Sequence, residues 1–344
     1  CRHIPTFTMD LLIVFKAASF LLLVIIRIPG NIFIILQFTF IRLLEKKILP
    51  TNIILMALAL ANLLVILSRI IPESLNSLGF KDLLDDSECK LVLFTYRVSR
   101  AMSMGVTSLL SCYQCVLIAP NTSIWLYLKK LVTQNVLVII LTIWFINLSM
   151  YLYSILNARA RRNLTTSPYT LHLVYCDADF LTYIAYITNG SFYALHDFIC
   201  VGLMALASDY IVYKLLHHEK SMKGMRSSDK NKSITVEQKA SRAVILLVAL
   251  YILMFGLDNS MWLYTLTLSN VSPNMNEIRI FLASSYSTFS PIVIIITNPK
   301  HQQFFVLCNK NRQLPAMSTY KPCNTKDLSS TLLELSFGYP SCCP

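Results

Sequence analysis

The stretch SECKLVLFTYRVSRAMSMGVTSLLSCYQC, residues 87–115, is mostly apolar and suited to a helix, yet it carries Arg97 and Arg100. At 1.5 Å per residue, these arginines lie about 12 and 16 Å below Cys89, the deeper one near the middle of a bilayer. A charge at that depth costs at least about 3 kcal/mol unless it faces water, a partner or the interior of a bundle. Because a separation of three residues puts both side chains on nearly one face, we predict that both point into a helix bundle.

The composition of the whole chain indicates a membrane protein. Its 344 residues are 55% hydrophobic and 14% charged, whereas about a quarter of the residues of a soluble domain are charged. A helical crossing needs roughly 20 apolar residues, and runs apolar on all sides exclude the alternating strands of a β-barrel. We predict an all-α membrane protein, a seven-transmembrane helix bundle, with spans at about residues 11–40, 51–72, 89–119, 132–155, 181–215, 241–268 and 277–298.

The charges of the loops predict the orientation of this bundle. Residues 73–88 contain five acids against Lys81, whereas residues 214–242 contain eight basic residues against three acids. Short loops rich in lysine and arginine prefer the cytoplasm, so the first loop is expected outside and the second inside, although Arg159, Arg161 and Arg162 disagree. The net charge of +12 is then mostly a topology signal and not evidence of nucleic-acid binding.

This orientation divides the chain into three parts. We expect an extracellular N-terminus at residues 1–10, the bundle at residues 11–298 and a cytoplasmic tail at residues 299–344, in a multi-pass protein of the plasma membrane. The lipid bilayer is then the first partner of the chain.

Two cysteines and one asparagine lie on the expected outer side. Cys89 stands at the outer mouth of the third span and Cys176 in the second outer loop, where an oxidising compartment favours a disulfide. The alternative is a pair of free thiols. This alternative is less favoured, because free thiols are apolar and Cys176 lies in a loop beside Asp177 and Asp179. In the same loop, Asn163 begins an Asn-Leu-Thr sequon and is the expected glycosylation site.

Several short motifs resemble those of rhodopsin-like G-protein-coupled receptors. They are Gly30–Asn31 in the first span, LALAN at residues 58–62, Trp144, and SPIVI at residues 290–294. Asn62 replaces the usual aspartate, and CYQC at residues 112–115 replaces the usual arginine motif. With the third-span sequence CKLVLFTYRVSRAMSMGVTSLLSCYQCVLIAPNTSIW, this combination resembles the vomeronasal type-1 receptors, called olfactory receptor class A-related receptors in fishes, from about residue 30 to residue 300.

The resemblance implies a G-protein-coupled chemosensory receptor. Its ligand would be a small odorant or pheromone, bound in the outer half of the bundle, and its partner a heterotrimeric G protein. The third, fifth and sixth helices would form the G-protein face with the basic third loop, and a short amphipathic helix would follow the last span. The expected coupling and switch residues are Tyr113, Gln114, Ser290 and Pro291.

The two buried arginines need a counter-ion. Asp258 is the first candidate, because it lies about 16 Å below the outer end of the sixth span, at the depth of Arg100, and Asp197 is a weaker one. If only one arginine is neutralised, the remaining charge favours an anionic ligand; alternatively, these charges only bind one another and orient the helices. The expected pocket residues are Tyr96, Arg97, Arg100, Met104, Asp258, Asn259 and Trp262.

Two other classes of membrane protein compete with a receptor. A transporter with a mid-membrane polar site would show internal repeats or paired broken helices, and the sequence shows neither; it stays the alternative function. An enzyme would need paired acids or a metal-binding set, and His196 with Asp197 is the nearest approach to one. We therefore expect no catalytic residue, no metal site and no cofactor. Arg27 lies within the first span, with Asn62 as a candidate partner.

Overall fold

The structure is a computed structural model. It describes residues 4–45, 49–77, 84–160, 170–172, 176–180, 182–224, 242, 244–254, 256–257, 260, 282, 285–286 and 288–296. The chain divides into two units, residues 1–299 and residues 300–344, and every described residue belongs to the first. The predicted tail and the amphipathic helix after the last span therefore lie outside the described residues.

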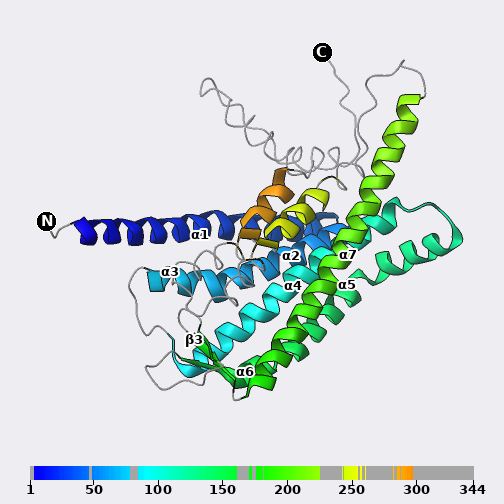
Figure 1. The fold of residues 1–344 in the computed structure, drawn as a ribbon. Helices are drawn as coiled ribbons and strands as arrows, with labels where there is room; N and C mark the ends of the chain where they lie inside the picture. The colour runs from blue at the N-terminus through cyan, green and yellow to red at the C-terminus, as the bar shows by residue number, and fades with distance from the viewer. Residues whose placement is uncertain are drawn as a thin grey trace, which may run out of the picture. The chain divides into compact units, whose positions relative to one another are not determined.

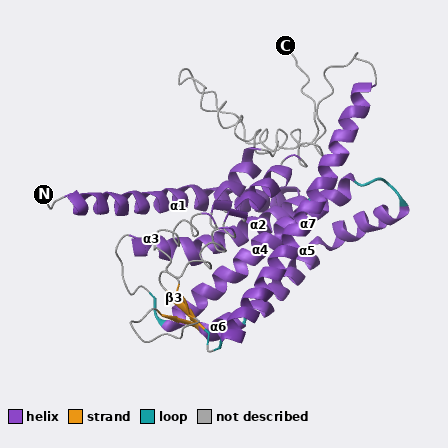
Figure 2. Ribbon diagram, viewed as in Figure 1, coloured by secondary structure: helices purple, strands orange, loops and turns teal. Residues whose placement is uncertain are grey.

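Helices make up most of the described chain (Figures 1 and 2). Residues 244–254 and 288–296 are helical as well. The elements in chain order are α1 (Ile4–Glu45), α2 (Pro50–Val65), the π-helix η1 (Ile66–Ile70), α3 (Ile71–Ser77), α4 (Asp86–Ile118), α5 (Ser123–Tyr151), α6 (Tyr153–Asn157), β1 (Ala158–Ala160), β2 (Thr170–His172), β3 (Cys176–Asp179) and α7 (Tyr183–Gly224).

Within the described residues, four helical stretches are long and apolar enough to cross a membrane. They are Pro50–Ile70, Asp86–Ile118, Ser123–Asn157 and Tyr183–His217. Two shorter apolar helices, Val24–Phe40 and Val244–Met254, fall inside the predicted first and sixth spans. A membrane-type helical protein is thus confirmed, whereas the count of seven spans stays a prediction.

α4 is the central helix, and its sequence defines both of its ends. Asp85 and Glu88 form a capping box in which each side chain accepts from the backbone N–H of the other residue, which satisfies free donors of the first turn. At the other end, Pro120 follows the C-cap residue Ala119. Between these ends, α4 packs against α2, α5 and α7 (Figure 1). The helix that carries the two arginines therefore lies inside the bundle.

The helix that contains the fourth predicted span begins before the span itself. We expected it to start at residue 132, after the charged pair Lys129 and Lys130, but α5 begins at Ser123. A local departure from helical geometry at Asn135 lies close to the predicted start. The helix continues across the lysines because the Lys129 ammonium donates to the Ala119 carbonyl at 2.8 Å and to Asn121 Oδ1 at 2.9 Å, at the end of α4.

The loop after α6 adds strands to the otherwise helical described chain. Its three short strands form an antiparallel sheet in the order β1–β3–β2 (Figure 2). The predicted Cys89–Cys176 disulfide is confirmed and ties β3 to the first turn of α4. The Ala160 amide donates to Asp86 Oδ1 at 2.8 Å, so two independent links hold this sheet on α4. Asn163 lies outside the described residues.

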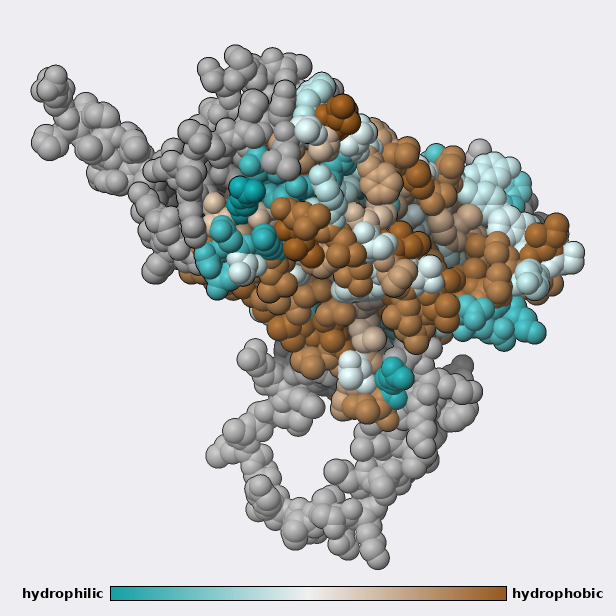
Figure 3. All heavy atoms as spheres, turned by 90° about the horizontal axis from the view of Figure 1, so that it is seen from below, coloured by the Kyte–Doolittle hydropathy of each residue, from teal (hydrophilic) through white to brown (hydrophobic). Residues whose placement is uncertain are grey.

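The surface of the described helices suits a lipid environment. Many large apolar side chains are exposed on α5 and α7, for example Leu141, Phe145 and Phe198 at 57%, 74% and 70%. Hydrophobic residues dominate the face seen in Figure 3. Soluble monomers rarely expose apolar patches of this extent, whereas lipid tails cover them in a membrane.

Candidate functional site

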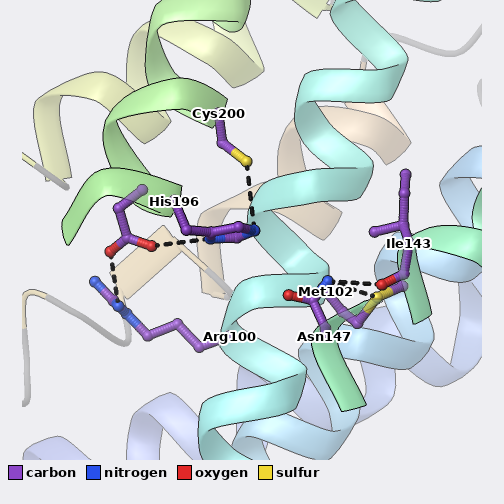
Figure 4. Close-up of polar contacts among 7 residues, drawn as sticks. Arg100, Met102, Ile143, Asn147, His196 and Cys200 are labelled. Atoms are coloured by element: carbon purple, nitrogen blue, oxygen red, sulfur yellow. Dashed lines mark hydrogen bonds and ion pairs between the residues drawn. The ribbon is translucent and has the colours of Figure 1, made fainter. Parts of the chain in front are cut away.

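An ion pair joins α4 to α7 in the middle of the bundle. Arg100 Nη1 lies 3.2 Å from Asp197 Oδ2 (Figure 4). The Arg100 side chain is 30% exposed and that of Asp197 is 11% exposed, so the guanidinium is open on one side while the carboxylate is enclosed. Such a pair fixes the two helices at one level and leaves part of the cation accessible.

The second oxygen of Asp197 faces a histidine on its own helix. His196 Nδ1 lies 3.5 Å from Asp197 Oδ1, and His196 Nε2 lies 3.8 Å from the Cys200 Sγ (Figure 4). Asp197 therefore stands between Arg100 and His196, with one oxygen toward each. The sequence predicted that His196 and Asp197 form no catalytic set and that Asp197 is a possible counter-ion, but it did not predict the contact between them.

A pair of stacked aromatic rings from α5 and α7 lies beside the second arginine. The Arg97 guanidinium lies over the Tyr193 ring, 5.6 Å from its centroid, and this ring stacks on Tyr151 with centroids 4.6 Å apart. A guanidinium at this distance is attracted by the negative face of a ring. On the α2 side, the buried Arg69 lies over the Tyr96 ring at 5.2 Å. We call Arg97, Arg100, Tyr151, Tyr193, His196 and Asp197 the arginine cluster.

Asn147 of α5 contacts α4 on the side away from the Arg100–Asp197 pair (Figure 4). Its Nδ2 donates to the Ile143 carbonyl at 2.9 Å and lies 3.4 Å from the sulfur of Met102, two residues after Arg100 (Figure 4). Asn147 is buried, and its Oδ1 has no hydrogen-bond partner within the part of the chain that the structure describes.

The expected pocket residues divide into two groups. The structure describes Tyr96, Arg97, Arg100 and Met104, all on α4, of which Met104 is fully buried. Asp258, Asn259 and Trp262 lie outside the described residues. The carboxylate paired with Arg100 is Asp197, the weaker of the two candidates from the sequence. Sequence reasoning missed Tyr151 and Tyr193, although Tyr193 lies four residues before Asp197 and hence on its face of α7.

One turn below Arg100, a chain of hydrogen bonds crosses three helices. Ser103 on α4 donates to Asn62 Oδ1 at 2.8 Å, and Asn62 Nδ2 donates to Ser290 Oγ at 2.8 Å. All three residues are buried. We call this the Ser103–Asn62–Ser290 relay; it connects α4 through α2 to the helix of residues 288–296.

The switch residues from the sequence lie on both sides of this relay. Ser290 belongs to it, and the next residue, Pro291, is in close contact with α1, since a Cβ on Gly30 would lie 3.2 Å from the proline ring. Tyr113 and Gln114 are buried further along α4, at 4% and 3% exposure. Whether these four residues switch is not tested by their positions and stays a prediction.

Among the described residues, Arg27 makes no hydrogen bond to Asn62. Its Nε instead donates to Thr288 Oγ1 on the seventh predicted span. The side chain is fully buried, and both terminal nitrogens have no hydrogen-bond partner among the described residues. α1 is thus held to the helix of residues 288–296 one turn above the Gly30–Pro291 contact.

Among the described residues, no group of three or more His, Cys, Asp or Glu side chains is arranged to hold a metal ion. The polar chemistry of the site is therefore that of guanidinium, carboxylate, imidazole and phenol groups. Such a set binds and orients a small molecule by charge, hydrogen bonds and ring contacts.

Comparison with known proteins agrees with this architecture. The family described as "Vomeronasal organ pheromone receptor family" matches residues 15–307. Olfactory receptor class A-like protein 1 of Danio rerio is 36% identical over 309 residues, which cover 90% of this chain and 97% of that protein. Vomeronasal type-1 receptor 3 of Homo sapiens is 26% identical over 84% of this chain and 93% of that protein. Vomeronasal type-1 receptor 90 of Rattus norvegicus is 28% identical over 85% of this chain and 94% of that protein.

Proposed function

Because this chain belongs to the vomeronasal organ pheromone receptor family, it is a chemosensory G-protein-coupled receptor and not an enzyme, and we propose that its ligand binds at the arginine cluster. Small-molecule ligands and G-protein coupling follow from the family in general. The observation that carries the proposal is the half-open Arg100–Asp197 pair between α4 and α7. The transporter alternative gains no support from relatives that are receptors.

The charges of the cluster favour one class of ligand. Between Tyr96 and Met104 on α4 and between Tyr193 and Cys200 on α7, the permanent charges are Arg97, Arg100 and Asp197. Their sum is positive, and the carboxylate already pairs with Arg100. An anionic or strongly accepting small molecule therefore gains most from this site, with Tyr151 and Tyr193 as ring contacts. Asp258, Asn259 and Trp262 of the sixth span are the remaining residues of the proposed pocket. Asp258 would bring its formal charge to zero, so the preference for an anion rests on the exposed part of the Arg100 guanidinium and not on net charge.

The proposal includes the orientation of the chain. Seven crossings of the plasma membrane place residues 1–10 outside and residues 299–344 inside. The sheet of β1–β3–β2 then lies at the outer mouth, above the arginine cluster, and Asn163 carries a glycan in the same loop. This arrangement puts the ligand site within reach of extracellular molecules.

α4 provides a short path from ligand to G protein. Arg100 and Ser103 lie three residues apart, about 4.5 Å along the helix, so a ligand that moves Arg100 also moves a member of the Ser103–Asn62–Ser290 relay. A ligand shifts the equilibrium between resting and active bundles only by its different affinity for the two states. We assign Tyr113, Gln114, Ser290 and Pro291 to the coupling of this conformational change to the G protein on the inner side of the bundle.

An activation assay tests the site. The chain is expressed with a promiscuous G protein and screened with steroid-like anions and small volatiles, with intracellular calcium as the readout. For an anionic agonist, Arg100→Gln is expected to raise the half-maximal concentration about 10- to 100-fold, because a hydrogen bond to a charged group is lost.

The matched control is Arg159→Gln. Arg159 is exposed on β1, so this variant removes the same charge outside the cluster and is expected to respond like the wild type. Equal responses of wild type and Arg100→Gln to every active anion, at equal surface expression, would exclude the cluster as the ligand site.

A further inference from the structure

The ends of α5 and α7 that face the proposed cytoplasmic side are joined by an aromatic pair. Trp125 in the first turn of α5 stacks on Tyr210 of α7, with ring centroids 6.4 Å apart and an interplanar angle of 22°. On α7, Tyr213 and His217 stack one turn apart, with ring centroids 6.2 Å apart. Since the apolar stretch of α7 ends at His217, these rings lie where a membrane-spanning helix meets the headgroup layer.

A lysine accompanies each ring of the Trp125–Tyr210 pair. The Lys214 Nζ lies over the Tyr210 ring, 5.6 Å from its centroid. On α5, Lys129 stands four residues after Trp125 and hence on its face, and its ammonium bonds to the end of α4. Lys214 therefore lies against the stacked rings, and Lys129 holds a second positive charge on the same face of α5 as Trp125.

The charge of this region is clearly positive. Residues 119–134 contain Lys129 and Lys130 and no acid, and residues 204–218 contain Lys214 and the single acid Asp209. Tyr127 and Tyr213 add exposed rings, at 68% and 62% exposure. Basic and aromatic side chains at the inner membrane boundary are complementary to the phosphate group of a lipid headgroup.

We propose that Trp125, Lys129, Tyr210 and Lys214 form a binding site for the phosphorylated headgroup of an anionic phospholipid of the inner leaflet. The lysines supply charge and N–H donors to the phosphate oxygens, while the tyrosine and tryptophan rings lie at the boundary between headgroups and tails. The site bridges α5 and α7 next to the end of α4. Its identification as an inner-leaflet site rests on the proposed orientation of the chain.

The test uses the full chain, purified into nanodiscs of phosphatidylcholine, with or without a minor fraction of phosphatidylinositol bisphosphate or phosphatidylserine. Native mass spectrometry counts the lipids that remain bound after release of the receptor. Lys214→Gln is expected to lower the retained anionic lipid about fivefold, the contribution of one lysine at a charged membrane surface, whereas Lys214→Arg keeps it.

Arg42→Gln is the matched control, because Arg42 is an exposed cation in the last turn of α1. Equal losses for Lys214→Gln and Arg42→Gln would show diffuse attraction and overturn the site, as would equal retention of phosphatidylcholine and anionic lipid by the wild type. Soluble inositol phosphate carries the same phosphate groups without lipid tails and is expected to compete for the site. Tighter binding of the soluble compound than of the lipid would assign the site to a free phosphate compound instead. The assay needs neither ligand nor G protein, so its outcome is independent of the activation assay.

Discussion

Cys89→Ser is expected to leave the receptor mostly unfolded and retained inside the cell. The Cys89–Cys176 disulfide closes a loop with a sequence separation of 87 residues. The chain-entropy relation for a loop of that length gives about 4–5 kcal/mol of stabilisation, which is a large part of the stability of a typical domain. The measurements are the fraction of receptor at the cell surface and the melting temperature of the purified protein.

The free cysteine Cys115 supplies the control for this variant. Cys115→Ser removes a half-buried thiol with no disulfide, and it is expected to fold like the wild type. Because both single changes break the same bond, Cys176→Ser and the double variant should show the same loss as Cys89→Ser. A Cys89→Ser receptor with wild-type melting and surface expression would contradict a structural role for the bridge.

Asp197→Leu is expected to destabilise the bundle by about 2–3 kcal/mol. The change leaves the Arg100 guanidinium at membrane depth without the carboxylate that it contacts at 3.2 Å. Breaking a buried pair in this way costs about 3–5 kcal/mol, and the 30% exposure of the Arg100 side chain lowers that figure. The loss is measured as a fall in the melting temperature of the purified receptor.

The double variant Arg100→Leu/Asp197→Leu separates stability from ligand recognition. Replacing both charges with apolar side chains removes the uncompensated cation, so the melting temperature is expected to return to near the wild-type value. The response to anionic ligands is expected to stay lost. A double variant that responds like the wild type would show that the two charges only orient α4 and α7.

The pairing of Arg100 with Asp197 shows what a single sequence lacks. Counted from the predicted span starts at residues 89 and 181, Arg100 lies 11 residues deep and Asp197 lies 16 residues deep. These two depths differ, so they did not indicate a contact. Counted from the observed starts of α4 and α7, Asp86 and Tyr183, both lie 14 residues deep, about 21 Å. Depth was a sound criterion, but it depends on helix starts that composition defines only to within several residues.

Other differences have equally local causes. Lys129 and Lys130 suggested the end of a loop, yet the Lys129 ammonium donates to the carbonyl of Ala119, the C-cap residue of α4, and so fits within a helix. The strands in the outer loop are three or four residues long, too short for alternation to be recognised in the sequence. The start of α4 carries a local signal that the predicted start at residue 89 did not use, the capping box of Asp85 and Glu88.

The sidedness of the two termini tests the account most directly, because the ligand site, the disulfide and the lipid site all depend on it. Epitope tags at the N-terminus and after residue 344 are stained with antibody on intact and on permeabilised cells. We predict that the N-terminal tag is stained on intact cells and the C-terminal tag only after permeabilisation. Staining of both tags under the same condition would mean an even number of crossings and contradict the seven-span orientation.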